Sequence, residues 1–266
     1  MCGERKDNCV LYEKDRYVAR ITLNKPEKRN ALDEELSREL CAALQKARDD
    51  DDVRAVVLTG NGTAFCAGGD VARFPEFGLE ESISFVRDGQ KVVPLFTEMS
   101  KPIVAAVNGA AVGAGLSIVL LCDIVISSDR AKYGAAFVKV GLVPDLAALY
   151  LLPRAVGLQK AKELSFTGKS VSAEEACSLG IVNRVVPHEE LESAVQQLAR
   201  TLTSGSASAI GAAKRLLNLS MDMDLKGLLE AEALTHRAAD SSSVVNSRVR
   251  KRFIKFSLSF LWQTPF

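Results

Sequence analysis

Two glycine-rich turns are the first places in this chain where residue type and spacing could support chemistry. Ala67-Gly68-Gly69 and Gly113-Ala114-Gly115 each follow an apolar run. Small residues let a ligand approach the backbone, and the free N–H groups at a helix start point toward it. Two such donors on one oxygen would form an oxyanion hole, where each donor is worth about 3 kcal/mol of transition-state stabilisation. Composition alone leaves open a second interpretation, in which both turns only allow a helix to pack tightly on a strand.

Two buried strands and a buried helix must position these turns. The runs 53–59 and 103–107 are short, apolar and partly β-branched, which predicts buried strands. Leu116 to Leu121 predicts an apolar helix directly after the second turn. The sequence therefore predicts a strand, a small-residue turn and a buried helix as one local binding unit for an anion or a developing oxyanion.

The order of the predicted elements indicates the fold class. A hairpin is expected around Lys14-Asp15-Arg16, and Asp33 is expected to cap a helix whose apolar residues recur at helical spacing. Strands alternate with helices over the first two thirds, and helices dominate beyond residue 157. This pattern predicts an α/β domain with a helical C-terminal part. The later helices are expected at 158–166, 172–179, 189–202, 206–219 and 225–239.

Composition excludes several classes of protein. The chain has 266 residues, 47% of them hydrophobic, and a formal net charge of +1, so nucleic acid is not expected as a partner. No stretch approaches the roughly 18 to 20 apolar residues that span a bilayer, and the polar start MCGERKDNCV predicts no signal peptide. Six cysteines without a CxxC pair favour reduced thiols over disulfides or a metal site. We expect a cytoplasmic globular protein without stable membrane insertion.

Several short motifs occur in a fixed order over about residues 10 to 240. They are Asn24-Lys25-Pro26, Asn30-Ala31-Leu32, Ala64-Phe65-Cys66-Ala67-Gly68-Gly69-Asp70, Lys101-Pro102, Val107-Asn108-Gly109, Cys122-Asp123-Ile124, Pro153-Arg154-Ala155-Val156-Gly157, Leu164-Ser165-Phe166-Thr167-Gly168, Ala173-Glu174-Glu175-Ala176 and Leu179-Gly180-Ile181-Val182. Together they resemble the crotonase superfamily, the enoyl-CoA hydratases and isomerases. Any one motif would be weak evidence, but their shared order is highly specific.

The resemblance implies a spiral of repeated ββα turns, assembly as a homotrimer or a dimer of trimers, and an acyl-coenzyme A thioester as substrate. Residues 1–200 would form the core, and residues 201–266 a helical trimerisation region. By matching motifs, the oxyanion donors would be the N–H groups of Gly69 and Ala114. No separate cofactor and no metal are expected, because coenzyme A is part of the substrate. The residues expected to hold it are Lys28, Arg29, Ala31, Ala64, Ala67 and Asp70.

The chain departs from the hydratase pattern at both catalytic acids. The resemblance places the two glutamates of the hydratases at Ser117 and Phe137, so both carboxylates are missing. One acid lies nearby, Asp145, at a position where isomerase branches of the superfamily carry a catalytic aspartate. The run from Ala136 to Asp145 resembles the phenylacetate-type branch, and Ser117, Phe137 and Leu142 would then line the acyl pocket. Capping of a helix over residues 146–152 is an alternative role for Asp145.

The carboxylate count favours an isomerase. Adding water to a double bond employs two acids in the hydratases, whereas one base can take a proton from one carbon and return it to another. The function expected is therefore a double-bond or ring-epoxide isomerase with Asp145 as its sole acid and base. A hydratase with another acid in the site and an inactive CoA-ester-binding homologue remain alternatives.

Three features complete the expectations from the sequence. Dehalogenase and Ser-His-Asp hydrolase chemistry each need a histidine near the motifs, and the chain has only His188 and His236, both far from them in sequence. Residues 241–266 are serine-rich, then basic, then apolar, and depart from the family's usual ending. Glu76, Glu80 and Glu81 lie on a stretch that could cover the acyl pocket.

Overall fold

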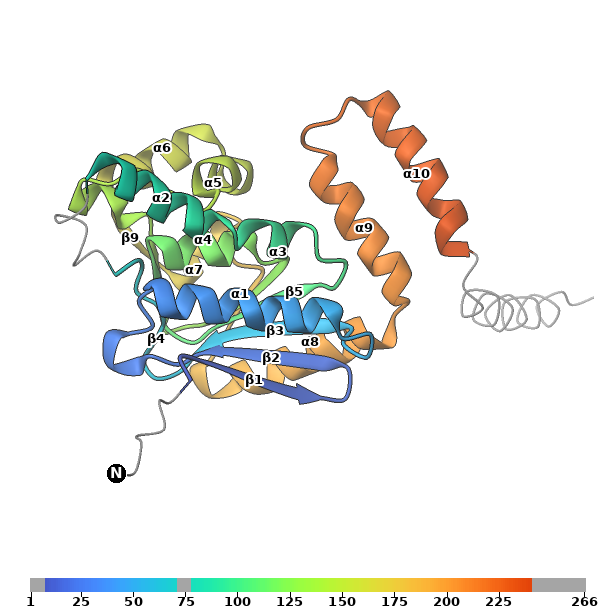
Figure 1. Cartoon of the computed structure of the whole chain (residues 1–266), viewed down its shortest axis with the longest axis horizontal. Coiled ribbons are helices and arrows are strands. Elements are labelled where there is room, and N and C mark those ends of the chain that lie inside the picture. Colours follow the sequence, from blue (N-terminus) through green and yellow to red (C-terminus); the bar gives the residue numbers. More distant parts are fainter. Residues whose placement is uncertain (1–7, 71–77, 241–266) are drawn as a thin grey trace, which may run out of the picture. The chain divides into compact units, whose positions relative to one another are not determined.

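A strand–strand–helix unit repeats along the chain in the computed structural model, which describes residues 8–70 and 78–240 (Figure 1). In the first unit, β1 and β2 before α1, both strands join a large sheet; in the next three, the first strand joins that sheet and the second joins a small one. Thus β3 and β4 precede α2 and α3, β5 and β6 precede α4, and β7 and β8 precede α5. The predicted spiral of ββα turns with a helical C-terminal region is confirmed.

The large sheet has six strands in the order β1-β2-β3-β5-β7-β10. The first two strands form the predicted antiparallel hairpin, and every other pair in this sheet is parallel. The strands are β1 (Val10–Asp15), β2 (Val18–Leu23), β3 (Ala55–Gly60), β5 (Ile103–Val107), β7 (Ile124–Ser128) and β10 (Arg184–Val186).

The small sheet has the order β4-β6-β8-β9, with only the last pair antiparallel. Its strands are β4 (Ala64–Cys66), β6 (Ala110–Val112), β8 (Lys132–Gly134) and β9 (Ser170–Ser172). Each has three residues, too few to show an alternating pattern, and the sequence did not predict these strands. Because β4 and β6 end at the two glycine-rich turns, this sheet brings the turns together.

Helices cover the sheets and connect them. Short 3-10 turns of the described residues lie at Pro26–Lys28, Ala136–Val140 and His188–Glu190. The α-helices are α1 (Glu34–Asp49), α2 (Leu79–Gln90), α3 (Val93–Thr97), α4 (Ala114–Leu121), α5 (Ala148–Val156), α6 (Leu158–Thr167), α7 (Ala173–Ser178), α8 (Leu191–Ser204), α9 (Ala207–Leu219) and α10 (Leu225–Asp240).

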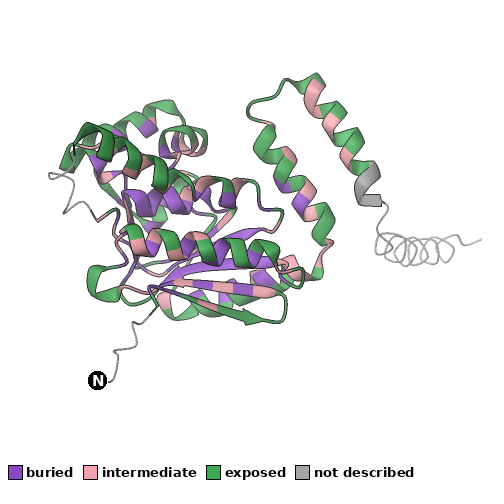
Figure 2. Ribbon diagram, in the orientation of Figure 1, coloured by how far each residue is buried: buried purple, intermediate pink, exposed green. Residues whose placement is uncertain are grey.

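The central strands β3 and β5 are buried on both faces (Figure 2), which explains their continuous apolar sequences. One face, with Val56 and Leu58, belongs to a large core that includes the inner side of α1. The opposite face, with Val57 and Val104, packs against α8. Burial on both sides fixes the strand ends, and the glycine-rich turns begin a few residues beyond them.

Helix α1 begins where the sequence predicts. Asp33 is its N-cap, and the Asp33 side chain accepts a hydrogen bond from the Leu36 backbone N–H at 2.9 Å. The helix buries the predicted apolar stripe of Leu36, Leu40, Ala43, Leu44 and Ala47.

The described part of the chain divides into two compact units between Thr203 and Ser204, and the second contains α9 and α10. The basic and apolar tail 241–266 and Glu76 lie outside the described residues. Among the helices of the described part, none combines the length and the apolar character needed to cross a bilayer.

Candidate active site

The two glycine-rich turns lie against each other. Gly68 has φ +116°, and a Cβ there would come within 3.2 Å of the Val112 carbonyl oxygen. Gly113 has φ +56°, and a Cβ there would lie 3.6 Å from the Cα of Gly68. Both backbones therefore favour glycine, and a side chain on Gly68 would push the turns apart. The two possible donors, one residue beyond each of these glycines, are held on neighbouring segments.

The N–H of Gly69 faces away from the neighbouring Leu32 segment. Leu32 pairs with Gly69 in a parallel bridge, in which Leu32 forms hydrogen bonds to the residues on either side of Gly69. The Leu32 N–H donates to the Gly68 carbonyl at 2.7 Å, and the Leu32 carbonyl accepts from the Asp70 N–H at 2.8 Å. The N–H and carbonyl of Gly69 itself must then face away from Leu32. Gly69 is exposed, and a Cβ on it would meet no described atom within 4 Å. Open space at this position leaves room for a ligand atom.

Ala114 is the first residue of α4. A backbone N–H in the first turn of a helix has no partner within that helix, and it carries the positive end of the helix dipole. The preceding turn is fixed to the small sheet because the Gly113 N–H donates to the Gly134 carbonyl at 2.8 Å. The fold thus presents the Ala114 amide from a rigid support, although the role of either donor stays a prediction.

Ser117 and Phe137 occupy the two positions expected to hold acids in a hydratase. Ser117 is fully buried, and its hydroxyl lies 3.4 Å from the Gly113 carbonyl, the acceptor of its own helical N–H. Phe137 is buried in the 3-10 turn after β8, and Leu142 folds back to donate its N–H to the Phe137 carbonyl at 3.0 Å. These residues offer apolar surface and one hydroxyl, but no carboxylate.

Asp145 provides the carboxylate. Its Oδ1 atom is buried and finds no hydrogen-bond partner in the part of the chain that the structure describes. Burial raises the pKa of the Asp145 side chain from 3.8 to about 6, and a hydrogen bond with its own backbone lowers it only in part. A carboxylate with this pKa exchanges protons readily near neutral pH.

The helix-cap alternative for Asp145 is wrong in the structure. Helix α5 starts at Ala148 instead of residue 146, and its N-cap residue is Ala147 with no side-chain cap hydrogen bond. The physical reason is that Leu146 and Ala147 both have positive φ, 48° and 65°, which interrupts the helical path between Asp145 and α5. The carboxylate is thereby separated from the first-turn N–H groups that it would have capped.

Asp145 and the Ala114 turn belong to neighbouring elements. The segment that carries Asp145 runs from β8 to α5. Strand β8 pairs with β6, the strand leading into Gly113, and α5 packs against α4. Both ends of the Asp145 segment are therefore attached to the elements that hold the second glycine-rich turn.

The residues expected to hold coenzyme A lie on the loop before α1 and on the strand beside it. The Lys28 ammonium pairs with Asp70 at 3.1 Å, and the Lys28 side chain is half exposed. The Ala31 N–H donates to the Lys28 carbonyl, and the Ala67 N–H donates to the Arg29 carbonyl at 3.0 Å. A cationic loop is thus joined directly to the segment that ends in Gly69.

Asn30 is a structural residue of this loop whose role the sequence analysis missed. It is fully buried with φ 57°, and its amide donates to the carbonyls of Asn61 and Ala64 at 2.9 and 2.8 Å. Its Oδ1 accepts from the Lys25 N–H at 2.9 Å. An asparagine between a basic loop and a helix is a recognisable signal, because asparagine tolerates positive φ better than most residues. Ala64, which was expected to contact coenzyme A, is buried at this junction.

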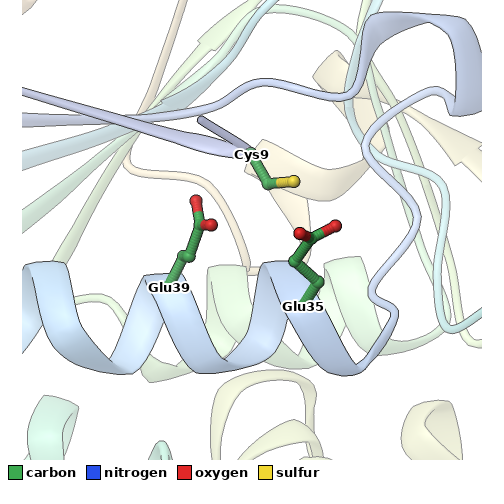
Figure 3. A group of neighbouring side chains, drawn as sticks. All are labelled: Cys9, Glu35 and Glu39. Carbon is green, nitrogen blue, oxygen red and sulfur yellow. The ribbon is translucent and has the colours of Figure 1, made fainter. Parts of the chain in front are cut away.

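One group of side chains could in principle ligate a metal ion. Figure 3 shows Glu35 and Glu39 projecting from α1 toward Cys9. The ligand atoms of these three described residues lie within 4.8 Å of one another. The Lys25 ammonium already lies 3.1 Å from Glu35, and Glu39 accepts from the Val10 N–H at 3.0 Å. Burial and the hydrogen bond to Glu35 raise the pKa of the Cys9 thiol, which disfavours the thiolate that a metal requires. These contacts give the three side chains a structural role where the start of β1 meets α1.

His188 contacts a serine, but not an accessible one. Its Nδ1 lies 3.0 Å from the Ser128 hydroxyl, and Ser128 is fully buried at the end of β7. A buried hydroxyl cannot reach a substrate, so this pair has the character of a structural contact between β7 and the turn before α8.

Comparison with known proteins identifies the family. Residues 13–255 match the enoyl-CoA hydratase/isomerase family, and the chain belongs to it. A short-chain-enoyl-CoA hydratase of Clostridium acetobutylicum is 34% identical over 253 residues, 93% of this chain and 97% of that protein. The 1,2-epoxyphenylacetyl-CoA isomerase of Escherichia coli is 34% identical over 260 residues, 93% of this chain and 98% of that protein.

The fold agrees with the same family. The crystal structure of an enoyl-CoA hydratase/isomerase from Cupriavidus metallidurans superposes with a TM-score of 0.89 at 36% identity, covering 93% of this chain and 94% of that one. The resemblance to the crotonase superfamily is confirmed, and relatives of both hydratase and isomerase name occur within it.

Proposed function

We propose that this protein isomerises an acyl-CoA thioester, with Asp145 as its only acid and base. The observation that carries the proposal is the Asp145 Oδ1 atom, which is buried and without a hydrogen-bond partner among the described residues. A carboxylate with a buried oxygen atom that accepts no hydrogen bond is a stronger base than an exposed one, and that atom is available to a substrate. The two positions that would hold the hydratase acids are occupied by Ser117 and Phe137, which have no carboxylate. This supports a reaction that uses one carboxylate instead of two.

The proposed reaction needs one proton transfer in each direction. With the thioester oxygen bound by the N–H groups of Gly69 and Ala114, ionised Asp145 removes a proton from C2, and the electron pair moves onto that oxygen. In a 3-enoyl ester the resulting dienolate then takes a proton from the Asp145 carboxyl group at C4. The double bond moves from C3–C4 to C2–C3, and Asp145 ends ionised, as it began.

The remaining residues would bind the ester. Lys28 and Arg29 would face the phosphates of coenzyme A, with Ala31, Asp70 and the backbone from Ala64 to Ala67 beside them. Ser117, Phe137 and Leu142 would line the acyl pocket. Coenzyme A enters as part of the substrate, and no separate cofactor is proposed. The name of the Escherichia coli relative adds ring-epoxide esters to the candidate substrates.

Hydration is the second candidate because relatives carry that name, such as the hydratase of Clostridium acetobutylicum. It would need a second acid to share the work of activating water, and neither Ser117 nor Phe137 provides one. A homologue that binds CoA esters without turnover is the third candidate.

We also propose assembly as a homotrimer or a dimer of trimers in the cytoplasm. Large apolar side chains exposed on α9 and α10 support an assembly role for the C-terminal unit: Leu217, Leu225, Leu229 and Leu234. Sedimentation equilibrium of the full chain should give three or six times the 28.7 kDa chain mass. A monomer at micromolar concentration would contradict the assembly without affecting the proposed reaction.

A panel of CoA esters in heavy water tests the reaction. We expect 3-enoyl or ring-epoxide esters to be converted to products of unchanged elemental composition, with deuterium incorporated at the proton-transfer positions as Asp145 exchanges with solvent. Mass spectrometry distinguishes this from hydration, because a 2-enoyl ester that is hydrated gains the mass of water. A product that has gained the mass of water would favour the hydratase. Lack of turnover on every ester would favour the homologue that binds CoA esters without converting them.

A further inference from the structure

The backbone directly after Asp145 takes an uncommon path. The Ala148 N–H donates to the Asp145 carbonyl at 2.9 Å, closing a four-residue turn. Its two central residues, Leu146 and Ala147, have φ of 48° and 65°. Positive φ at both central positions defines a type I′ turn, which ordinarily contains glycine, asparagine or aspartate. Each residue of ordinary type in this region costs about 1–2 kcal/mol.

A less costly path is available to the same sequence. If Leu146 and Ala147 were helical, α5 would start two residues earlier and Asp145 would stand at its N-cap, a position that aspartate favours by about 1 kcal/mol over alanine. In the observed structure Leu146 and Ala147 keep positive φ, and Asp145 is not the N-cap of α5. Strain that persists against such an alternative must be held by the surrounding structure, and it is concentrated at functional positions.

Packing holds the turn. Leu146 is 5% exposed and belongs to the large core. Its Cδ2 atom would lie 3.6 Å from a Cβ on Gly89, so the leucine side chain rests against the last turn of α2. Ala147 is partly buried against the same core, and α5 packs on α4. The turn is therefore anchored on both sides.

We propose that Leu146 and Ala147 are positioning residues for Asp145, in that their type I′ turn withholds the first-turn N–H groups of α5 and leaves the carboxylate's Oδ1 atom free for the substrate. The inference rests on the proposed role of Asp145 as acid and base. It adds that the strained turn, and not the aspartate alone, makes the base available. If first-turn N–H groups of α5 capped Asp145, they would stabilise its ionised form and make it a weaker base. The turn prevents this capping.

Substitutions at Ala147 separate backbone geometry from bulk. Asparagine and valine are of similar size, but asparagine accepts positive φ and β-branched valine does not. We expect Ala147→Asn and Ala147→Gly to keep kcat within about threefold of the wild type, with an unchanged pH profile. Ala147→Val should lower kcat by about tenfold or more, because small displacements of a reacting group are costly. Its KM should change by less than about threefold, because no contact to the ester is removed.

The pH profile distinguishes positioning from general damage. In Ala147→Val the acidic limb of kcat/KM should move to lower pH, because the carboxylate gains N–H donors. If the valine variant does not fold, as judged by circular dichroism and gel filtration, Leu146→Ala replaces it. That variant removes the anchor on α2 without adding bulk, and the same shift of the acidic limb is expected.

Each remaining outcome decides between the two proposals when Asp145→Asn is measured beside these variants. If Asp145→Asn is inactive while Ala147→Val, or Leu146→Ala in its place, keeps both kcat and the wild-type profile, the positioning inference is overturned and the base survives. If Asp145→Asn retains turnover, the proposed function itself is wrong. Equal losses in the asparagine and valine variants of Ala147 would show that bulk matters and the turn geometry does not.

Discussion

Replacing Asp145 with asparagine is expected to lower kcat by about 10²–10⁴-fold, the usual contribution of a positioned general acid–base group. Asparagine keeps the shape of the side chain, so the thioester site and its KM should change little. The loss should fall on the chemical step, because the base is missing in the transition state but not in ground-state binding. Steady-state kinetics on an ester that the wild type converts, with Asp88→Asn on exposed α2 as the control, measure the effect.

The pH dependence of the wild type follows from the same carboxyl group. Isomerisation requires ionised Asp145, so kcat/KM, which reports the free enzyme, should rise with pH through an apparent pKa of about 6 and then level off. An exposed aspartate would place this limb near pH 4. A limb absent from the range between pH 5 and 7 would contradict Asp145 as the base.

Asp145→Asn should also stabilise the folded protein at neutral pH. Because burial raises the pKa of Asp145 in the folded state above its ordinary 3.8, the folded state binds the proton more tightly than the unfolded chain. The associated stability is fully present below about pH 4 and is lost as pH rises through about 6. At pH 7 the wild type should therefore unfold more easily than the variant, by on the order of 2 kcal/mol. Urea unfolding at pH 7 and at pH 4 tests the sign, since the difference should largely vanish at the lower pH.

Replacing Ala114 with proline is expected to reduce kcat by about 10²–10³-fold, the effect of losing one oxyanion-hole donor. Proline is well tolerated as the first residue of a helix, where its missing N–H has no intrahelical partner and its fixed φ suits the helix. The substitution thus deletes the proposed donor while the helix start is retained. Its ring also occupies the space in front of the former N–H, so substrate binding should weaken as well.

A matched control is available at Ala207. This residue is the first of α9, is exposed and follows the capping serine Ser206, so Ala207→Pro makes the same backbone change far from the glycine-rich turns in sequence. We expect Ala207→Pro to keep the wild-type kcat and thermal midpoint. A folded Ala114→Pro variant with full turnover would remove Ala114 from the site.

Elements specified by neighbouring residues could be predicted from the sequence. The strand Ile103–Val107 is a self-contained apolar run, and α1 has its cap and its apolar stripe within a few turns of one another. The three-residue strands of the small sheet could not be predicted in this way, because they are defined only by pairing with one another across the repeats.

The candidate site likewise has parts that local sequence predicts and parts that depend on tertiary contacts. The glycine-rich turns are visible in the sequence because their conformations demand glycine at positions 68 and 113. The conformation after Asp145 is not, because leucine and alanine have no local preference for positive φ and adopt it through packing on α2 and the core. Local rules favoured a helix cap there, and tertiary contacts overrode them.

The main-chain nature of the proposed donors has a consequence for evolution. An amide N–H survives almost every side-chain replacement at its own position, so point mutations that change the acids around it leave the oxyanion-binding turns intact. Serine at 117 and phenylalanine at 137 illustrate such exchange, since both glycine-rich turns persist beside them. A scaffold of this kind can lose one catalytic acid and recruit another without passing through a state that no longer binds the thioester oxygen. In such a site the catalytic side chains can change by point mutation while the main-chain donors are retained.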